Sequence, residues 1–486
     1  MSQFPGESGL IINEPLLWEK ERKGRCGYSL PKREVERQEL AAEFQGPAPD
    51  LPELSEVDVV RHYTRLSQWN VGVDSVTYPL GSCTMKYNPR INEAMSGLAG
   101  FAGAHPLLPA SLSQGALSLM FNLERHLAEI TGMDGASLQP SAGAQGELTG
   151  ILLINAYLKS RGENRTKILV PDTAHGTNPA SAALCGLRAV AVKSGPEGVL
   201  LPESVEELMD SDTAGIMVTN PNTLGLFEEN IKQIAEIVHE RGGQVYCDGA
   251  NLNALMGMVK MGEIGVDVIH LNLHKTFSAP HGGGGPGCGP VCVRSHLEPF
   301  LPVPRIGPDQ GQGHQLIWDR PQSVGKIHAF YGNFGVMIKA YCYILSMGPR
   351  YLKLASQLAV LNANYVKEKL KGTFELAYDR PCMHECVFSD ARQAPHGVST
   401  LDMAKKMMDY GFHPPTIYFP LVVHGALMIE PTETESKEDL DSFIAACQEI
   451  AKQAETDPEL LHNAPVRPKL TRLDETLAAR KPRLAG

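Results

Sequence analysis

The chain has 486 residues, 43% of them hydrophobic and 20% charged, with a net charge of −11 at pH 7 and a pI near 5.8. This length exceeds what one hydrophobic core usually supports, so we expect two or three structural parts in a soluble globular protein rather than a disordered one. The acidic balance and the lack of a long basic run make nucleic acid a poor candidate partner.

Targeting and cysteine features predict a cytoplasmic protein without a metal site. The N-terminal stretch MSQFPGESGLIINEPLLWEK lacks the basic segment and uninterrupted apolar segment of a secretory signal. No stretch approaches the roughly 20 apolar residues of a membrane span. The ten cysteines are scattered, and the segments CGPVC and CMHEC lack a second ligand pair at a zinc-site spacing, so packed thiols are expected.

The first part of the chain, residues 1–75, is rich in charge and proline, and LSEVDVVRHYTRLSQ predicts one helix there. We expect an extended arm. A second, amphipathic helix is predicted at 115–132, because apolar residues recur at spacings of three and four and Gly132 ends the pattern. Beyond it, five short runs predict buried strands: KILVP, RAVAVK, AGIMVT, QVYCD and VDVIHL.

The alternation of strands and helices predicts an α/β fold. Between the third and fourth runs, LFEENIKQIAEIVHERGG reads as a helix, so residues 76–330 are expected to form a mostly parallel, helix-covered sheet. From residue 331 the pattern changes to longer helices, GVMIKAYCYILSMG and YLKLASQLAVLNANYVKEKLKG. Strand-like ELAYDR and ECVFSD and a helix after Ser436 follow, which predicts a smaller C-terminal α+β domain over 331–486.

Polar residues directly follow four of the predicted strands. DTAHGTNPA follows KILVP, NPNTLG follows AGIMVT, Asp248 follows QVYC, and His274 and Lys275 follow VDVIHLNL. Ligands of an open α/β sheet bind at the carboxyl ends of its strands. These polar residues are therefore expected to share one crevice.

Lys275 stands in the segment HLNLHKTFSAPHGGGG, which allows several interpretations. A phosphate-binding loop would place its glycines before the lysine, whereas here they follow it. A dinucleotide fingerprint matches at Gly282, Gly284 and Gly287, but PVCVR, which comes next, reads as a strand rather than the required helix. The remaining interpretation is a lysine that forms an imine.

An imine-forming lysine indicates pyridoxal phosphate, whose chemistry needs three further groups. Asp248 is a candidate partner for the ring nitrogen, and His175 is a candidate platform for the ring face. The small residues 141–144 of QPSAGAQGE precede an apolar helix, whose free N–H groups and dipole attract phosphate. Each residue alone is equally well explained as a strand cap, a loop histidine or a helix start, but their joint order favours a cofactor site.

Five segments carry a family resemblance: PLGSCTMKYNP, QPSAGAQGE, AHGTNPASA, CDGAN and HLNLHKTFSAPHGGGGPGCGP. They resemble the pyridoxal-phosphate-bearing half of glycine decarboxylase, the P-protein of the glycine cleavage system. The similarity runs from about residue 55 into the C-terminal part. In some members of that family both halves form one chain, whereas this chain resembles the separate lysine-bearing subunit, subunit 2.

The resemblance implies a fold-type I pyridoxal-phosphate enzyme and assigns residues to it. Lys275 would form the internal aldimine, with Asp248 paired to the ring nitrogen and His175 stacked on the ring. The remaining residues that it implies are Ala142, Gly143, Ala144 and Gln145 at the phosphate, and Asn272 and His274 beside the lysine.

The implied activity is that of glycine dehydrogenase (aminomethyl-transferring), an oxidoreductase of glycine catabolism. Glycine would lose carbon dioxide, and its aminomethyl group would pass to the lipoamide of the H-protein. The implied partners are subunit 1, in a heterotetramer of two copies of each subunit, and the lipoylated H-protein. An aminotransferase or a cysteine desulfurase of the same fold, or a non-catalytic partner of another subunit, stays open as an alternative.

Overall fold

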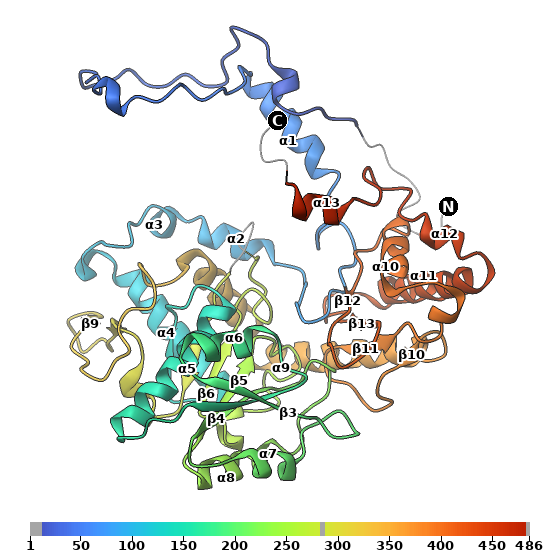
Figure 1. The fold of residues 1–486 in the computed structure, drawn as a ribbon. Helices are drawn as coiled ribbons and strands as arrows, with labels where there is room; N and C mark the ends of the chain where they lie inside the picture. Colours follow the sequence, from blue (N-terminus) through green and yellow to red (C-terminus); the bar gives the residue numbers. More distant parts are fainter. Residues whose placement is uncertain (1–11, 282–286, 483–486) are drawn as a thin grey trace.

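The computed structural model describes residues 12–281 and 287–482. It consists of an extended N-terminal segment, a region built on a seven-stranded sheet (the large sheet) and a region built on a four-stranded sheet (the small sheet) (Figure 1). None of the helices in the described ranges has the length and apolar character needed to cross a membrane.

The N-terminal segment leads into helix α1, Glu56–Ser67. Ser55 caps this helix, because its hydroxyl accepts the N–H of Asp58 and the Asp58 carboxylate accepts the N–H of Ser55. Glu14 joins the preceding segment to the helix, with carboxylate oxygens 3.0 Å from His62 Nδ1 and 2.8 Å from Arg65 Nη1. The predicted helix is confirmed, and the segment before it lies away from both sheets (Figure 1).

The large sheet has the strand order β1-β7-β6-β5-β4-β2-β3. Strands β2 to β6 are parallel, and β7 is antiparallel to both of its neighbours. All five predicted strands are present, so the mostly parallel sheet is confirmed. The bounds are β1 Gly135–Ser137, β2 Lys167–Pro171, β3 Arg188–Val192, β4 Thr213–Thr219, β5 Gln244–Gly249, β6 Val268–Leu271 and β7 Val291–Val293.

Strand β3 differs from the expectation of a buried strand. It lies at the edge of the large sheet and pairs there with β2 alone. Val192 is its one fully buried residue. The apolar run RAVAV therefore identified a strand correctly but not its place, because an edge strand has a neighbour on one side only.

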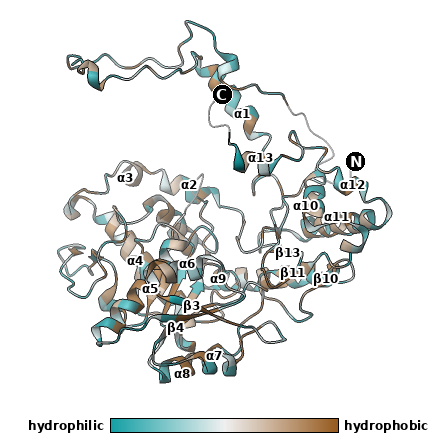
Figure 2. Ribbon diagram, viewed as in Figure 1, coloured by the Kyte–Doolittle hydropathy of each residue, from teal (hydrophilic) through white to brown (hydrophobic). Residues whose placement is uncertain are grey.

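Helices cover both faces of the large sheet. Helices α5 and α6 share a hydrophobic core with one face, and α4, α8 and the first part of α9 share another core with the opposite face. Hydrophobic residues are concentrated in α5 and in the strands beneath it (Figure 2). The helices are α2 Arg90–Ser96, α3 Ala99–Ala102, α4 Gln114–Thr131, α5 Gly143–Ser160, α6 Thr177–Leu184, α7 Pro202–Leu208, α8 Ile231–Glu240 and α9 Phe334–Leu370.

Helix α9 joins the two regions and contains a break. Gly348 adopts φ 61° and ψ 174°, outside helical geometry, and Pro349 follows it. The two separately predicted helices are thus confirmed as the two halves of α9. Residues of the first half, such as Ile338, pack in the large-sheet core, and residues of the second half, such as Val366, pack in the core of the small sheet.

The small sheet is antiparallel, with the order β10-β11-β13-β12. Its strands are β10 Glu375–Leu376, β11 Cys386–Ser389, β12 Thr416–Ile417 and β13 Ala426–Ile429, and the C-terminal helices are α10 Thr400–Asp409, α11 Lys437–Thr456, α12 Glu459–His462 and α13 Glu475–Arg480. A separate two-stranded hairpin consists of β8 Arg305–Ile306 and β9 Leu316–Ile317.

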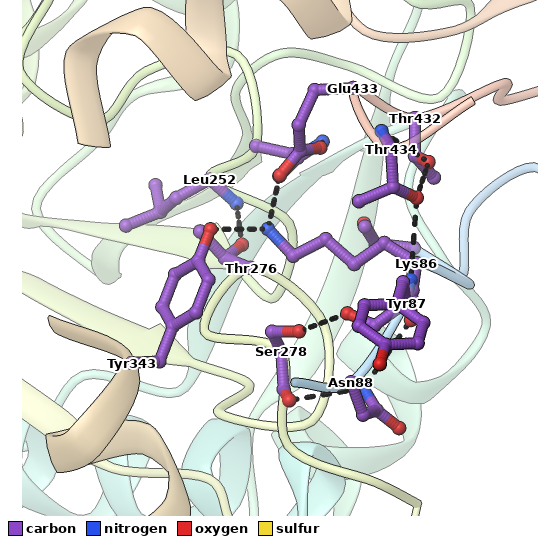
Figure 3. A network of polar contacts seen from close by, with 12 residues as sticks. Lys86, Tyr87, Asn88, Leu252, Thr276, Ser278, Tyr343, Thr432, Glu433 and Thr434 are labelled. Atoms are coloured by element: carbon purple, nitrogen blue, oxygen red, sulfur yellow. Dashed lines mark hydrogen bonds and ion pairs between the residues drawn. The ribbon is translucent and has the colours of Figure 1, made fainter. Parts of the chain in front are cut away.

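The segment at 77–90, defined here as the crossing segment, contacts both regions. Leu80 forms a β-bridge with Ile429 at the end of β13. Farther along, the buried amine of Lys86 lies 2.8 Å from Glu433 Oε1 and 3.2 Å from the Tyr343 hydroxyl (Figure 3). The crossing segment is thereby held between the large sheet, α9 and the chain that follows β13.

Candidate active site

The predicted crevice is present at the carboxyl ends of β4, β5 and β6. A cavity of about 220 Å³ opens there. It is lined by Ser82, Gly143, Ala144, Glu147, His175, Thr177, Thr219, Pro221, Asn222, Thr223, Asp248, Ala250, Asn251, Asn272, Lys275, His384 and Glu385. The lining residues thus come from the large-sheet region, from the crossing segment and from the residues directly before β11 of the small sheet.

Most of the site residues expected from the sequence meet in this cavity: Gly143, Ala144, His175, Asp248, Asn272 and Lys275. Three others lie just outside its lining. Ala142 precedes the first turn of α5, and the Gln145 side chain turns back to accept the N–H of Ser141 at 2.7 Å. His274 is buried and accepts the N–H of Cys288 at 3.3 Å.

The amine of Lys275 is positioned by the crossing segment. Its Nζ donates a hydrogen bond to the backbone carbonyl of Ser82 at 2.7 Å. Ser82 has a positive φ of 64°, an uncommon conformation for a residue with a side chain. The loop after the lysine is fixed too, because the Ser278 hydroxyl donates to the carbonyl of Tyr87 and Asn88 donates to the carbonyl of Ser278 (Figure 3).

Asp248 is buried near the end of β5, and hydrogen bonds hold its carboxylate in place. The carboxylate accepts the N–H of Ala250 at 3.0 Å and the amide of Asn178 at 3.3 Å. His270 Nε2 lies 3.6 Å away, and burial lowers the pKa of this imidazole, which keeps it neutral. Asp248 is therefore oriented by neutral groups, which leaves its charge available to a ligand in the cavity.

His175 belongs to a chain of polar contacts that leads to Glu147. Its Nδ1 lies 2.9 Å from the hydroxyl of Thr177, which lies 2.8 Å from Oε1 of Glu147. Burial, followed by the nearby charge of Asp248, raises the pKa of Glu147 to about 8. This carboxyl was not among the predicted site residues, although Glu147 is the last residue of the QPSAGAQGE segment.

The start of α5 has the free backbone N–H groups that the predicted anion cradle requires. The first hydrogen bond of its i to i−4 pattern runs from Gly146 N–H to the carbonyl of Ala142, which leaves the N–H groups of residues 143–145 at the free end of the helix. A Cβ at Gly143 would approach Asn272 Oδ1 to 2.7 Å. Only glycine fits there without displacing the amide that borders the cavity.

The glycines after Lys275 have a packing role where the structure describes them. A Cβ at Gly287 would lie 2.1 Å from His274 Nδ1, and a Cβ at Gly289 would lie 2.1 Å from the carbonyl oxygen of Ala142. The bare backbone thus brings the lysine loop against the start of α5. Gly282 and Gly284 of the fingerprint interpretation lie outside the described residues.

The small sheet supplies cavity residues that the sequence analysis did not identify. His384 and Glu385 line the cavity immediately before β11, while Cys382 and Cys386 of the same CMHEC segment pack in the small-sheet core. The cysteines are thus packed thiols, as expected. The polar residues between them, His384 and Glu385, are the part of that segment that reaches the cavity.

The residues of the cavity fit pyridoxal phosphate. Glu147 Oε2, Thr219 Oγ1 and Asn272 Oδ1 belong to residues that line the cavity and are buried polar atoms without a hydrogen-bond partner in the described part of the chain. A polar ligand would complete them. The lysine amine, the oriented carboxylate and the free helix start match the carbonyl, the ring nitrogen and the phosphate of that cofactor.

Comparisons with known proteins point to one family. The family model of the glycine cleavage system P-protein matches residues 32–313, and that of the glycine dehydrogenase C-terminal domain matches residues 355–464. A probable glycine dehydrogenase (decarboxylating) subunit 2 of Caldanaerobacter subterraneus is 57% identical, over 96% of this chain and 97% of its own. A protein of the same description from Bacillus cereus is 53% identical, over 97% of each chain.

Solved structures show the same fold. A crystal structure of glycine decarboxylase (P-protein) of the glycine cleavage system has a TM-score of 0.72 at 22% identity, over 85% of this chain and 93% of that one. A cysteine desulfurase from Escherichia coli has a TM-score of 0.61 at 14% identity, over 78% and 95%. The fold is that of fold-type I enzymes, and the cofactor is pyridoxal phosphate. With these matches over nearly its whole length, the chain belongs to the glycine cleavage system P-protein family, in its subunit 2 form.

Proposed function

We propose that this chain carries the cofactor site of a two-subunit glycine decarboxylase. It decarboxylates glycine in the glycine cleavage system and passes the aminomethyl group to the lipoyl disulfide of the H-protein. The observation that carries the proposal is the convergence of Lys275, Asp248 and the start of α5 on one cavity. The acceptor rests on the family resemblance.

Pyridoxal phosphate, when bound, supplies a protonated ring that takes up the electron pair left behind by carbon dioxide. In this proposal Lys275 holds the cofactor covalently, and Ser82 orients its amine before that bond forms. Asp248 holds the proton at the ring nitrogen, because Asn178 and Ala250 fix its carboxylate without neutralising it. His175 covers one face of the ring and excludes water from it.

The anchoring of the phosphate follows from the helix start. The free N–H groups of residues 143–145 would donate to the phosphate, and the dipole of α5 would favour its negative charge. Asn272 lies against Gly143 and would border the same group. His274 contributes indirectly, since its bond with Cys288 fixes the backbone next to Lys275.

We also propose a partner, subunit 1, in a heterotetramer of two copies of each subunit. The matching proteins are described as subunit 2, which supports a second chain. The N-terminal segment supports it as well, because large hydrophobic side chains are exposed there: Tyr28 by 73%, Leu30 by 82%, Val35 by 74% and Phe44 by 71%. The cytoplasmic location stays a prediction.

The test replaces the lysine. Lys275→Ala is expected to abolish both the visible absorbance of the bound cofactor and the exchange of carbon dioxide with the carboxyl group of glycine. The circular dichroism spectrum should stay that of the wild type. Exchange is measured with labelled bicarbonate, in the presence of the partner subunit and lipoylated H-protein.

Lys371→Ala is the control, because Lys371 pairs with Asp379 on the surface, away from the cavity lining. This variant is expected to retain absorbance and exchange. Wild-type exchange in Lys275→Ala would contradict the proposal. Turnover of another amino acid without any lipoyl protein would favour an aminotransferase or a cysteine desulfurase instead.

A further inference from the structure

Two glutamates of the small sheet face each other beside the lysine. Glu385 comes directly before β11 and Glu430 directly after β13. Cys386 and Ile429 are partners in the antiparallel register, so the two glutamates occupy the next rung of the ladder. Both are buried, and one atom from each lies within 4.8 Å of the other and of a ring nitrogen of His384.

The crossing segment connects this pair to Lys275. Ser82 donates its N–H to Glu385 at 2.7 Å and accepts the lysine amine on its carbonyl at 2.7 Å. Glu430 accepts the hydroxyl of Thr84 at 2.6 Å and the amide of Asn251 at 3.0 Å. Glu385 thus lines the cavity, one residue away from the amine that holds the cofactor, and Glu430 is its buried neighbour behind the lining.

The surroundings keep a proton on the pair. Burial, followed by mutual repulsion, raises the pKa of Glu385 to about 8, and burial raises the pKa of Glu430 to about 7. Burial lowers the pKa of His384 to about 3, so its imidazole stays neutral. Lys275 acts against both changes, since it lowers the pKa of each glutamate. The other titratable groups that face the pair are Cys83, Cys382 and Glu433.

A divalent cation is the competing occupant, because His384 and the two glutamates offer ligand atoms close together. Three donors already occupy carboxylate oxygens of the pair, from Ser82, Thr84 and Asn251. These hydrogen bonds leave few carboxylate oxygens free to bind a cation, which favours a shared proton as the occupant.

The proposed reaction consumes one proton. The bond between the glycine carboxyl and methylene carbons breaks, and carbon dioxide leaves. The electron pair forms a carbon–sulfur bond, the disulfide breaks, and its pair stays on the second sulfur, which becomes a thiol on taking up a proton. Because the glycine nitrogen is an ammonium group at the start and at the end, this is the one proton consumed.

We propose that Glu385 and Glu430 store this proton and deliver it to the departing sulfur of the lipoyl disulfide. The inference rests on the proposed function. It adds a proton donor that acts after decarboxylation and is supplied by the small sheet. An isosteric amide at either position removes the stored proton and keeps the side-chain volume.

The experiment separates the two half-reactions in the complex with subunit 1 and lipoylated H-protein. Glu385→Gln and Glu430→Gln are each expected to lower aminomethyl transfer at pH 7 by about 100-fold, the usual size of a general-acid contribution. Exchange of carbon dioxide with glycine needs no protonated sulfur, so it should stay within about twofold of the wild type. The visible absorbance of the cofactor should be unchanged.

The control is Glu435→Gln, since Glu435 accepts a hydroxyl from Thr77 and burial raises its pKa to about 7, but the charged group that acts on it is Asp439 rather than Lys275 or the pair. It should leave transfer unchanged. In the wild type, transfer should fall as the pH rises past 8, and this decline should disappear in Glu385→Gln.

Wild-type transfer in both glutamine variants, a parallel loss of exchange, or a stoichiometric divalent cation in the purified complex would overturn the inference. A wild-type complex that neither exchanges nor transfers would contradict the proposed function itself.

Discussion

At the scale of single residues, Lys86 shows how a buried charge fixes the crossing segment. Its amine contacts Glu433, Tyr343 and Asn253, which belong to three different parts of the chain. Burial opposes the charge, but Glu433 and Tyr343 together more than offset this, so the pKa of Lys86 is raised. An ion pair in such a place is costly to break, because the remaining carboxylate stays buried and unpaired.

Lys86→Met is therefore expected to destabilise the protein by about 3–5 kcal/mol, measured by urea unfolding. The exposed pair of Lys437 and Asp441 provides the control. Lys437→Ala should cost less than about 1 kcal/mol, because solvent screens that pair. Equal stability of the two variants would show that the Lys86 network does not hold the crossing segment.

At the scale of elements, the lysine loop and helix α5 depend on a close approach of two backbones. The Cβ of an alanine at Gly289 would lie 2.1 Å from the carbonyl oxygen of Ala142, the residue before the helix. Gly289→Ala is expected to displace the start of α5 and to weaken binding of pyridoxal phosphate by at least about tenfold, since the N–H groups no longer converge on the phosphate.

Binding is measured by titrating the apoprotein with the cofactor and following absorbance. Gly335→Ala is the matched control, because Gly335 lies in the first turn of α9 with open space around its α-carbon. Alanine suits a helix better than glycine does, so this variant should bind the cofactor normally. Unchanged affinity in Gly289→Ala would mean that the helix start tolerates the displacement.

Elements with a clear apolar period were predictable from the sequence. Helix α4 ends at Gly132 as expected, with that glycine at φ 71°, and the five parallel strands coincide with the apolar runs. Strand β1 was missed because its three residues, GAS, contain no apolar run. Local patterns thus predicted the large sheet, since each of those elements carries its own signal.

The cavity was predictable where its residues follow strands of the large sheet or begin helix α5. Asp248 and Lys275 could be placed together, because the carboxyl ends of parallel strands share one edge. Ser82 acts through its backbone carbonyl, and Glu385 and Glu430 come from a different sheet. No spacing in the sequence encodes such long-range contacts.

At the scale of the whole molecule, buried carboxyls make stability depend on pH. Burial raises the pKa of several glutamates to about 7 or 8: Glu124, Glu147, Glu228, Glu385 and Glu430. In the unfolded chain these groups release their protons near pH 4.5. The folded chain therefore binds more protons than the unfolded chain between these pH values. The stabilising contribution of these carboxyls is thus complete below about pH 4.5 and is lost as the pH rises through 7 and 8.

The window from pH 7 to 8 isolates this effect best. Surface carboxyls whose pKa is lowered by ion pairs, such as Asp210, change their protonation far below it. Histidines whose pKa is lowered by burial, such as His274, stay neutral in the folded chain, and above pH 7 they are mostly neutral in the unfolded chain too. The melting temperature is therefore expected to fall as the pH rises from 7 to 8.

Glu228→Gln should make this decline shallower. Glu228 is fully buried and accepts the N–H of Leu200 and the amide of Asn222, and an amide at this position no longer exchanges a proton on unfolding. Each such carboxyl contributes at most about 1.4 kcal/mol per pH unit. Glu206→Gln is the control, because Glu206 is exposed and pairs with Arg241. If both variants keep the wild-type slope, the buried carboxyls do not carry the pH dependence.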